Sequence, residues 1–229
     1  MTGLPHIAAS KPVDLRQELE VWLAEAKRGQ GRSRQLHKVP ESIHLDPAVI
    51  ASCKRNKVIL ASGATHFEQH CEVVPTAYRD TATVCSSHLE RDVARAALLQ
   101  TELGKWLLEV ARVNCYRSPG GVGTPLHFDA KHAMVMQTVG TKRWWVADAP
   151  GHPFPTRNCV PLPGASTVFH DRKLVPIPNP ASLRSLFMTP GDVLLLPAGT
   201  WHCTEAETAS TSFTIAFMRT GGLSPANPS

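Results

Sequence analysis

Apolar and polar residues follow two different periods along the chain, and each period predicts a different kind of element. In the first third, apolar residues recur at helical spacing at Leu15, Leu19, Trp22, Leu23 and Ala26. This pattern predicts an amphipathic helix over about 15–28. Asp14 has the side chain of a helix N-cap, and Gly29 is suited to ending the helix.

Further elements are expected before the middle of the chain. A short helix is predicted from Asp46, where Pro47 takes the first helical position. The apolar run 58–62 predicts a strand. Ser87 and Glu90 have the spacing of a capping box, so a second helix is expected from Ser87 to about residue 103.

From Trp106 onward the pattern becomes strand-like. Short segments rich in β-formers are bounded by glycine and proline, at 107–116, 133–139, 142–147, 192–196 and 212–218. Gly140 and Thr141 suit a tight hairpin turn between two of them. Many short strands separated by turns predict a β-sandwich or barrel. The segment 149–180 holds eight prolines without periodicity, which predicts a lid or binding loop.

Length and composition favour one compact domain. The chain has 229 residues, of which 42% are hydrophobic, enough to bury a full core. We expect an N-terminal helical segment at 1–105, packed on a β-rich core at 106–229. No apolar run is long enough to span a membrane, and no secretory signal is visible. Six cysteines without a Cys-x-x-Cys pair suggest reduced thiols and a cytoplasmic location.

The net charge of +5 raises the question of an anionic partner. The densest basic stretch, 27–38, contains no interleaved aromatic residue and no nucleic-acid motif, so nucleic acid is not an expected partner. The stretch is interpreted either as a solvated helix end and loop or as a contact for an anionic partner.

Two histidines and one aspartate are candidate metal ligands. His127 and Asp129 form a His-x-Asp pair, and His202 closes the block Pro-Gly-Asp-Val-Leu-Leu-Leu-Pro-Ala-Gly-Thr-Trp-His. On a strand, residues two apart project from the same face, so His127 and Asp129 can reach one ion. Two histidines and one carboxylate with open positions are the ligand set of a mononuclear non-haem iron site.

These motifs resemble those of the cupin superfamily. Gly191-x5-Pro197-x-Gly199-x2-His202 matches its second motif, and Gly121-x5-His127-x-Asp129, with Gly140 downstream, resembles its first motif. Two positions depart from the common cupin pattern: Asp129 stands where a histidine is usual, and Ala133 where a glutamate is usual. This substitution pattern resembles the JmjC-type, cupin-like branch of Fe(II)- and 2-oxoglutarate-dependent oxygenases.

The same branch carries Thr-Pro-x-His-x-Asp followed by Gly-x-Lys-Arg, as this chain does at 124–129 and 140–143. The resemblance implies that Lys142 pairs with the distal carboxylate of 2-oxoglutarate and that Thr124 donates a hydroxyl to it. Asn114 or Tyr116 is a candidate for the contact that some relatives make with an asparagine. Arg219 is a rival anchor for the carboxylate.

The period-2 pattern places Lys142 and Trp144 on one face of their strand, and Arg143 and Trp145 on the other. Lys142 therefore either points into the barrel or is a surface lysine of the hairpin. The remaining residues near the motifs are interpreted as structural. Trp201 is expected to pack, His132 to face away from the metal, and Cys115 and Cys203 to be small buried residues.

The resemblance implies a double-stranded β-helix, or jelly roll, with N-terminal helices packed outside it. It also implies an enzyme that uses Fe(II), 2-oxoglutarate and O₂, decarboxylates 2-oxoglutarate to succinate and hydroxylates a C–H bond. The substrate would be an amino-acid residue in a peptide or protein, or a related small metabolite, and an anionic substrate is compatible with the charge. Two alternatives stay open: demethylation of N-methyl lysine or arginine, and a metal-binding cupin that does not use 2-oxoglutarate. The chain is expected to be a monomer or homodimer.

Overall fold

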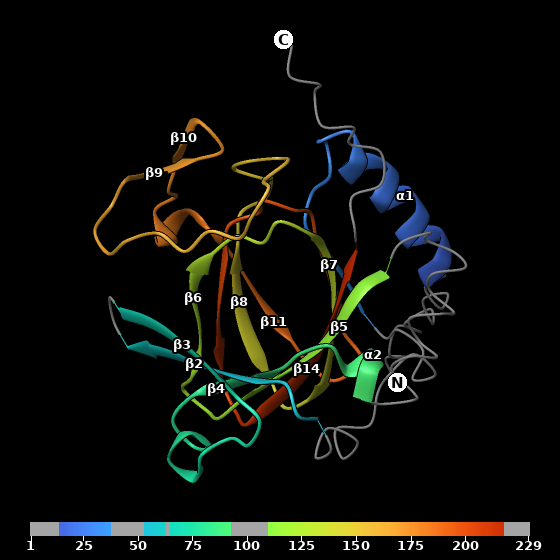
Figure 1. The fold of residues 1–229 in the computed structure, drawn as a ribbon. Coiled ribbons are helices and arrows are strands. Elements are labelled where there is room, and N and C mark those ends of the chain that lie inside the picture. Colours follow the sequence, from blue (N-terminus) through green and yellow to red (C-terminus); the bar gives the residue numbers. More distant parts are fainter. Residues whose placement is uncertain (1–13, 38–52, 63–64, 93–109, 218–229) are drawn as a thin grey trace, which may run out of the picture.

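Two β-sheets face each other across the centre of the molecule (Figure 1). The computed structural model describes residues 14–37, 53–62, 65–92 and 110–217. The larger sheet has eight strands in the order β1-β12-β7-β14-β5-β4-β2-β3, and the smaller has four in the order β11-β8-β13-β6. The strands of the larger sheet, in chain order, are β1 (Arg34–Leu36), β2 (Asn56–Ser62), β3 (Thr65–Cys71), β4 (Thr83–Ser86), β5 (Val110–Ser118), β7 (His132–Val139), β12 (Val193–Leu196) and β14 (Ser210–Phe217). Those of the smaller sheet are β6 (Gly123–His127), β8 (Lys142–Val146), β11 (Arg184–Met188) and β13 (His202–Ala206).

The chain crosses repeatedly from one sheet to the other. From β5 to β8, and again from β11 to β14, each strand joins the sheet opposite its predecessor, and the strand pairs are antiparallel. This is the winding of a double-stranded β-helix, so the predicted jelly-roll core is confirmed. The hairpin predicted at Gly140 and Thr141 joins β7 to β8.

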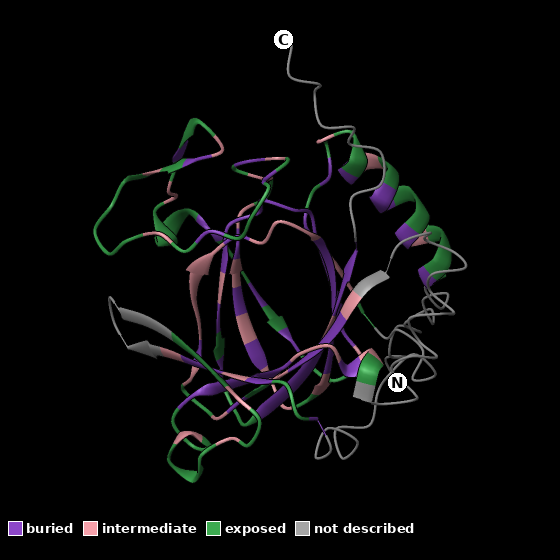
Figure 2. Ribbon diagram, viewed as in Figure 1, coloured by how far each residue is buried: buried purple, intermediate pink, exposed green. Residues whose placement is uncertain are grey.

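Strand β7 shows how the alternating pattern builds two separate cores. Met134 and Met136 point outward and pack against α1 (Leu15–Lys27), whereas Ala133 and Val135 point between the sheets. Because residues two apart share a face, one strand contributes to both cores. Figure 2 shows the buried stripe along the inner side of α1 and the exposed outer side.

The helix α1 forms as predicted. Asp14 accepts hydrogen bonds from the backbone N–H groups of Arg16 and Gln17, which satisfies donors that a helix start leaves unpaired. Trp22 is fully buried, and its indole N–H donates to the carbonyl of Arg32 at 3.0 Å. The helix therefore seals the outer face of the larger sheet.

The N-terminal third is less helical than expected. The predicted strand at 58–62 is present as β2, but β1, β3 and β4 were not predicted. β1 pairs with β12 and β4 pairs with β5, so both edges of the inner jelly-roll sheet are covered. An uncovered edge would leave backbone donors and acceptors unpaired, which explains why this segment adopts strands. The short helix predicted from Asp46 and the boundary at 105 lie outside the described residues.

The remaining helical elements are short. α2 (Leu89–Asp92) begins close to the position predicted by the capping pattern, and its expected continuation lies outside the described residues. η3 (Thr76–Tyr78) and η4 (Pro180–Ser182) are single 3₁₀ turns. None of the helices in the described part of the chain has the length and apolar character needed to cross a membrane.

The proline-rich segment 149–180 is not a structureless loop. It carries a hairpin of β9 (Thr167–His170) and β10 (Lys173–Pro176), which projects from one end of the sandwich (Figure 1). Asp171 and Arg172 form the hairpin turn, with φ angles of 49° and 62°. Phe128 and Cys159 exchange both backbone hydrogen bonds at 3.0 Å, so this segment is fixed beside the His-x-Asp pair.

Candidate metal centre

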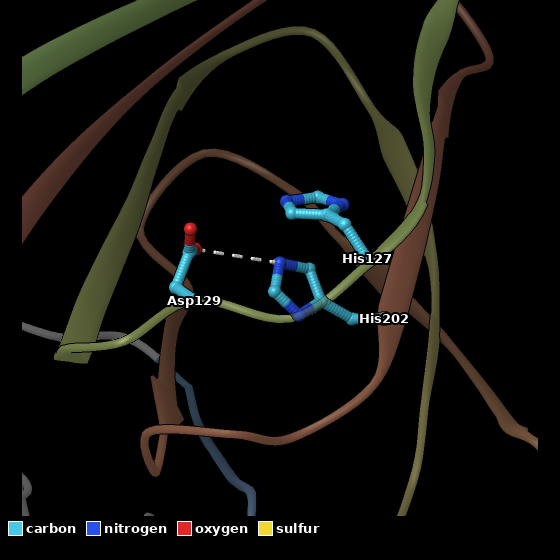
Figure 3. A group of neighbouring side chains, drawn as sticks. All are labelled: His127, Asp129 and His202. Carbon is cyan, nitrogen blue, oxygen red and sulfur yellow. Dashed lines mark ion pairs between the residues drawn. The ribbon is translucent and has the colours of Figure 1, made fainter. Parts of the chain in front are cut away.

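The three predicted ligand residues lie together at one end of the smaller sheet (Figure 3). His127 ends β6 and His202 begins β13, and the two face each other in the strand pairing. One ligand atom from each of His127, Asp129 and His202 lies within 4.8 Å of the others. Nε2 of His202 is 3.8 Å from Oδ2 of Asp129, and the imidazole centroids are 4.2 Å apart. The geometry brings two nitrogens and one carboxylate to a common point.

Both imidazoles are held with Nε2 toward that point. Nδ1 of His127 lies 2.7 Å from the carbonyl of Pro125, and Nδ1 of His202 lies 2.9 Å from the carbonyl of Thr200. Each Nδ1 must therefore carry the proton and donate it, which leaves the Nε2 lone pair available as a ligand. Burial and the neighbouring His127 lower the pKa of His202 to about 4, so this ring is neutral at physiological pH.

Asp129 reaches the site from a different local structure than predicted. β6 ends at His127, and Asp129 lies beyond it instead of on the same regular strand. Phe128, between them, is fully buried and packs against Trp201 on the opposite side. The alternation of a strand therefore persists for two residues after the strand ends, and the two ligands still share a face.

Gly199 fixes the turn that holds Asp129. Its N–H donates to the carbonyl of Asp129 at 2.8 Å, and its φ of +76° belongs to the left-handed region that favours glycine. A Cβ at this position would lie 1.7 Å from the carbonyl oxygen of His152. The Pro-Ala-Gly turn thus positions the backbone around both Asp129 and His202.

An interior cavity of about 40 Å³ extends from the three ligands between the sheets, and an outer cleft of about 360 Å³ adjoins it. Tyr116, Thr124, His127 and Asp129 line both spaces. The candidate metal centre therefore lies where the two spaces meet. Ala133 also faces the interior cavity, so the position where cupins commonly have glutamate offers no ligand here.

Lys142 lines the interior cavity and is 2% exposed. Its Nζ donates to Oγ of Ser118 at 3.2 Å, and no carboxylate of the described residues lies within ion-pair distance. Burial lowers the pKa of Lys142 to about 8. Trp144 is buried while Arg143 and Trp145 are half-buried, so the predicted alternation along β8 is confirmed and the surface-lysine alternative is wrong.

Hydroxyl groups accompany the lysine in the cavity. Oγ1 of Thr124 lies 2.9 Å from Oγ1 of Thr204, and either can donate to the other. Thr204 was not predicted, although it is two residues after His202 and so shares its face of β13. Ser118, which accepts the hydrogen bond from Lys142, was also missed; it is two residues after Tyr116 on β5 and does not itself line the cavity.

The two further candidates on β5 have different positions. Tyr116 lines the cavity, and the nearby Cys85 thiol together with burial raises the pKa of its phenol, so it stays protonated. Asn114 does not line the cavity, and its Oδ1 accepts a long bond from the N–H of His88 at 3.4 Å. Asn114 also hydrogen-bonds to Tyr116, which does line the cavity. Arg219 lies outside the described residues.

The residues interpreted as structural mostly behave as expected. His132 faces α1, where its ring meets Trp22 at 5.9 Å and its Nδ1 accepts from the N–H of Ala198. Trp201 is buried in a third apolar cluster with Phe128. Cys115 is buried, but Cys203 is only half-buried, so the prediction for Cys203 is wrong.

A family profile for the JmjC domain matches residues 94–222, which is more than half of the chain and includes all three candidate ligands and Lys142. The chain belongs to the JmjC domain family. The predicted resemblance to the JmjC-type branch is thereby confirmed.

Individual JmjC-family relatives are distant. Jumonji C domain-containing protein 5 of Drosophila melanogaster is 26% identical over 110 residues, which cover 46% of this chain and 27% of that protein. YcfD, a ribosomal oxygenase from Escherichia coli, superimposes with a TM-score of 0.60 at 15% identity, in structures with cobalt and succinic acid and with cobalt and 2-oxoglutarate. The match covers 86% of this chain and 51% of YcfD. The chain thus spans about half or less of these relatives, and the structural likeness concerns the fold.

Proposed function

We propose that this JmjC-family chain is an Fe(II)- and 2-oxoglutarate-dependent oxygenase that hydroxylates a C–H bond of an amino-acid residue in a peptide or protein. One observation carries the proposal. The cavity that is lined by the three candidate metal ligands also contains Lys142, a buried cation without a carboxylate partner among the described residues. Burying an ammonium group is costly unless a negative charge compensates it. A dianionic co-substrate that also binds the metal supplies that charge.

The donor set fits Fe(II). Two neutral imidazoles and one carboxylate are the protein ligands of non-haem iron oxygenases, and three ligands leave positions open for a bidentate co-substrate and dioxygen. His127 and His202 would bind through Nε2, and Asp129 would contribute the negative charge. Iron bound there would, with 2-oxoglutarate and O₂, supply the oxidising equivalents for attack on a C–H bond.

The chain's own residues would bind and orient 2-oxoglutarate. Lys142 would pair with the carboxylate remote from the metal, and Ser118 fixes the direction of its Nζ through the 3.2 Å hydrogen bond. Thr124 and Thr204 can each turn a hydroxyl toward the same carboxylate. Hydrogen bonds from charged donors are the strong ones, so Lys142 would contribute most of the affinity. Trp144, stacked on His202 with centroids 5.7 Å apart, excludes water from this side.

The relatives support this co-substrate. YcfD has been crystallised with cobalt together with 2-oxoglutarate or succinic acid and is described as a ribosomal oxygenase. Because this chain covers only about half of YcfD, its own substrate does not follow from that description. A peptide or protein substrate is favoured by the outer cleft, whose volume of about 360 Å³ opens to the surface beside the metal ligands.

The chemistry of the outer cleft favours hydroxylation over demethylation. Among the described residues, its lining has one aromatic side chain, Tyr116, and one carboxylate besides Asp129, that of Glu68. Lys57 already pairs with Glu68 at 2.9 Å. A methylated ammonium group is recognised by an aromatic cage or by carboxylates. Here Tyr116 alone makes no cage, Glu68 pairs with Lys57, and Asp129 is a candidate metal ligand.

The proposal is tested by turnover of purified protein with Fe(II), 2-oxoglutarate and a peptide library. The wild type is expected to produce succinate. The single variants H127A and D129A should produce no more succinate than the double variant H127A/D129A, which serves as the background. Mass spectrometry of the peptides should show a gain of one oxygen atom. Release of formaldehyde without oxygen gain would instead establish demethylation, and absence of any 2-oxoglutarate binding would refute the oxygenase assignment.

A further inference from the structure

A second cluster of metal-ligating side chains lies outside the JmjC metal centre, in the segment that follows β8. His152 lies in the loop, His170 ends β9, and Asp171 opens the turn of the β9–β10 hairpin. One ligand atom from each lies within 4.8 Å of the others. Nε2 of His152 and Nδ1 of His170 are both 3.1 Å from Oδ2 of Asp171. Both rings are buried, with 7% and 2% exposed.

The orientation of His170 leaves one buried nitrogen without a hydrogen-bond partner. Its Nε2 lies 3.1 Å from the carbonyl of Arg157, so that nitrogen carries a proton. Nδ1 then carries a lone pair and lies 3.1 Å from Oδ2 of Asp171. This atom is buried and has no hydrogen-bond partner among the described residues. A lone pair beside a carboxylate is repulsive, and a cation between them removes the repulsion.

We propose that His152, His170 and Asp171 form a second metal site, for a divalent ion of the zinc class. Two imidazole nitrogens and one carboxylate oxygen are ligands that Zn²⁺ accepts, with water completing the tetrahedron. The ligand atoms would be Nε2 of His152, Nδ1 of His170 and a carboxylate oxygen of Asp171. The assignment does not depend on which metal the first site holds or on 2-oxoglutarate.

The surroundings of the cluster have the features of an outer ligand shell. A metal-bound histidine usually donates its other N–H to a carbonyl or carboxylate, and His170 does so to Arg157. Thr156 donates to Asp171 through its backbone N–H at 2.7 Å and through its hydroxyl. Burial raises the pKa of Asp171, but the bonds from Thr156 outweigh it and lower the pKa to about 2, so the carboxylate stays charged.

A metal at this position would brace the first site. Phe128, between two of the first-site ligands, packs its ring edge-on against His170 at 5.1 Å and His152 at 6.3 Å. The backbone of the loop is joined to the same region, since the N–H of Gly151 donates to Gly199, which in turn donates to Asp129. The second ion would therefore be structural: it would hold the loop against the segment that carries His127 and Asp129.

The test measures how many zinc ions each chain binds. The protein is first stripped of metal, then loaded with Zn²⁺ and desalted, and the bound zinc is measured by elemental analysis. Zinc is used because it can occupy both sites. The wild type should hold two ions per chain, H127A/D129A one, and H152Q/H170Q one. A matched control, H37A, changes an exposed histidine that belongs to neither cluster and should keep two. One ion in the wild type and none in H127A/D129A would overturn the proposal, and so would an unchanged count in H152Q/H170Q.

A second measurement covers the case in which H152Q/H170Q does not fold. X-ray absorption at the zinc edge of H127A/D129A should show two imidazoles and an oxygen-rich remainder. The midpoint temperature of thermal unfolding of H127A/D129A should rise when Zn²⁺ is added and fall back to its metal-free value when a chelator removes the ion. A spectrum without imidazole, or a midpoint that does not respond to Zn²⁺, would contradict the second site. Failure of the oxygenase proposal would instead appear as absent 2-oxoglutarate turnover with the zinc count unchanged.

Discussion

Replacing Lys142 with methionine should stabilise the protein and weaken 2-oxoglutarate binding at the same time. Methionine keeps much of the length and apolar volume of the lysine stem but removes the buried charge. The pKa of Lys142 falls from 10.5 to about 8 through burial. The folded protein therefore binds this proton less tightly than the unfolded chain does, and the charge opposes folding.

The size of the stability effect follows from that difference. At about 1.4 kcal/mol for each pH unit, a pKa of about 8 instead of 10.5 corresponds to roughly 3 kcal/mol against folding. This cost is fully present below pH 8, shrinks as the pH rises from 8 to 10.5, and vanishes above 10.5. Without co-substrate at pH 7, K142M should be more stable than the wild type by up to about this amount, and the two should converge at high pH.

Binding of 2-oxoglutarate should change in the opposite direction. Truncating one partner of a buried charge pair costs about 2–5 kcal/mol, which corresponds to a loss of affinity between about 30-fold and several thousand-fold. In the wild type, affinity should also weaken above pH 8 as Lys142 loses its proton, whereas K142M should show no such dependence.

Urea denaturation at several pH values and calorimetric titration with 2-oxoglutarate, in protein loaded with a redox-inert metal, measure the two effects. The control is R143M, on the outward face of the same strand, where Arg143 forms a surface ion pair with Glu207 at 2.8 Å. Such pairs contribute about 0–1 kcal/mol, so stability and affinity should change little. The reasoning is refuted if K142M binds 2-oxoglutarate as the wild type does, or if it destabilises the metal-loaded, co-substrate-free protein.

Three further changes test other parts of the structure. G199A places a Cβ 1.7 Å from the His152 carbonyl at a φ of +76°, so denaturation should show a loss above about 1–2 kcal/mol together with weaker metal binding; unchanged stability would contradict the tight turn. T204V removes one hydroxyl of the pair with Thr124 and should weaken 2-oxoglutarate binding by about 0.5–1.5 kcal/mol in the same titration, whereas equal affinity would exclude Thr204 from the pocket. W22A empties a buried site under α1 and should cost about 3–5 kcal/mol of stability; a smaller loss in urea denaturation would mean that α1 is loosely packed.

The sequence predicted the core strands and the ligand set because both leave short-range signals. Period-2 alternation identified β7 and β8, and it placed Lys142 on the same face as Trp144 without deciding whether that face points inward. The bounds of β6, which ends at His127, and of β13, which begins at His202, were not predicted, because each strand is short and carries polar residues on its inner face. Such strands are recognised only once the cavity that their polar side chains line is known.

Other features depend on contacts between distant segments. β1 becomes a strand because it pairs with β12, some 160 residues later, and three residues offer no detectable period. The cluster of His152, His170 and Asp171 joins residues from the loop and from the β9–β10 hairpin that lie far apart in the sequence, so spacing alone gave no signal. Asp129 was predicted on a strand and lies just beyond the end of β6, after Phe128, which forms a β-bridge with Cys159.

The most direct test of the central claim is the visible absorption of the anaerobic Fe(II) protein on addition of 2-oxoglutarate. If His127, Asp129 and His202 hold the iron and Lys142 binds the same co-substrate molecule, the wild type should develop a metal-to-ligand charge-transfer band that saturates with 2-oxoglutarate. K142M should develop the band only at a much higher 2-oxoglutarate concentration, and H127A/D129A should not develop it. A wild type without the band, or the same titration in all three proteins, would contradict a shared iron and 2-oxoglutarate site.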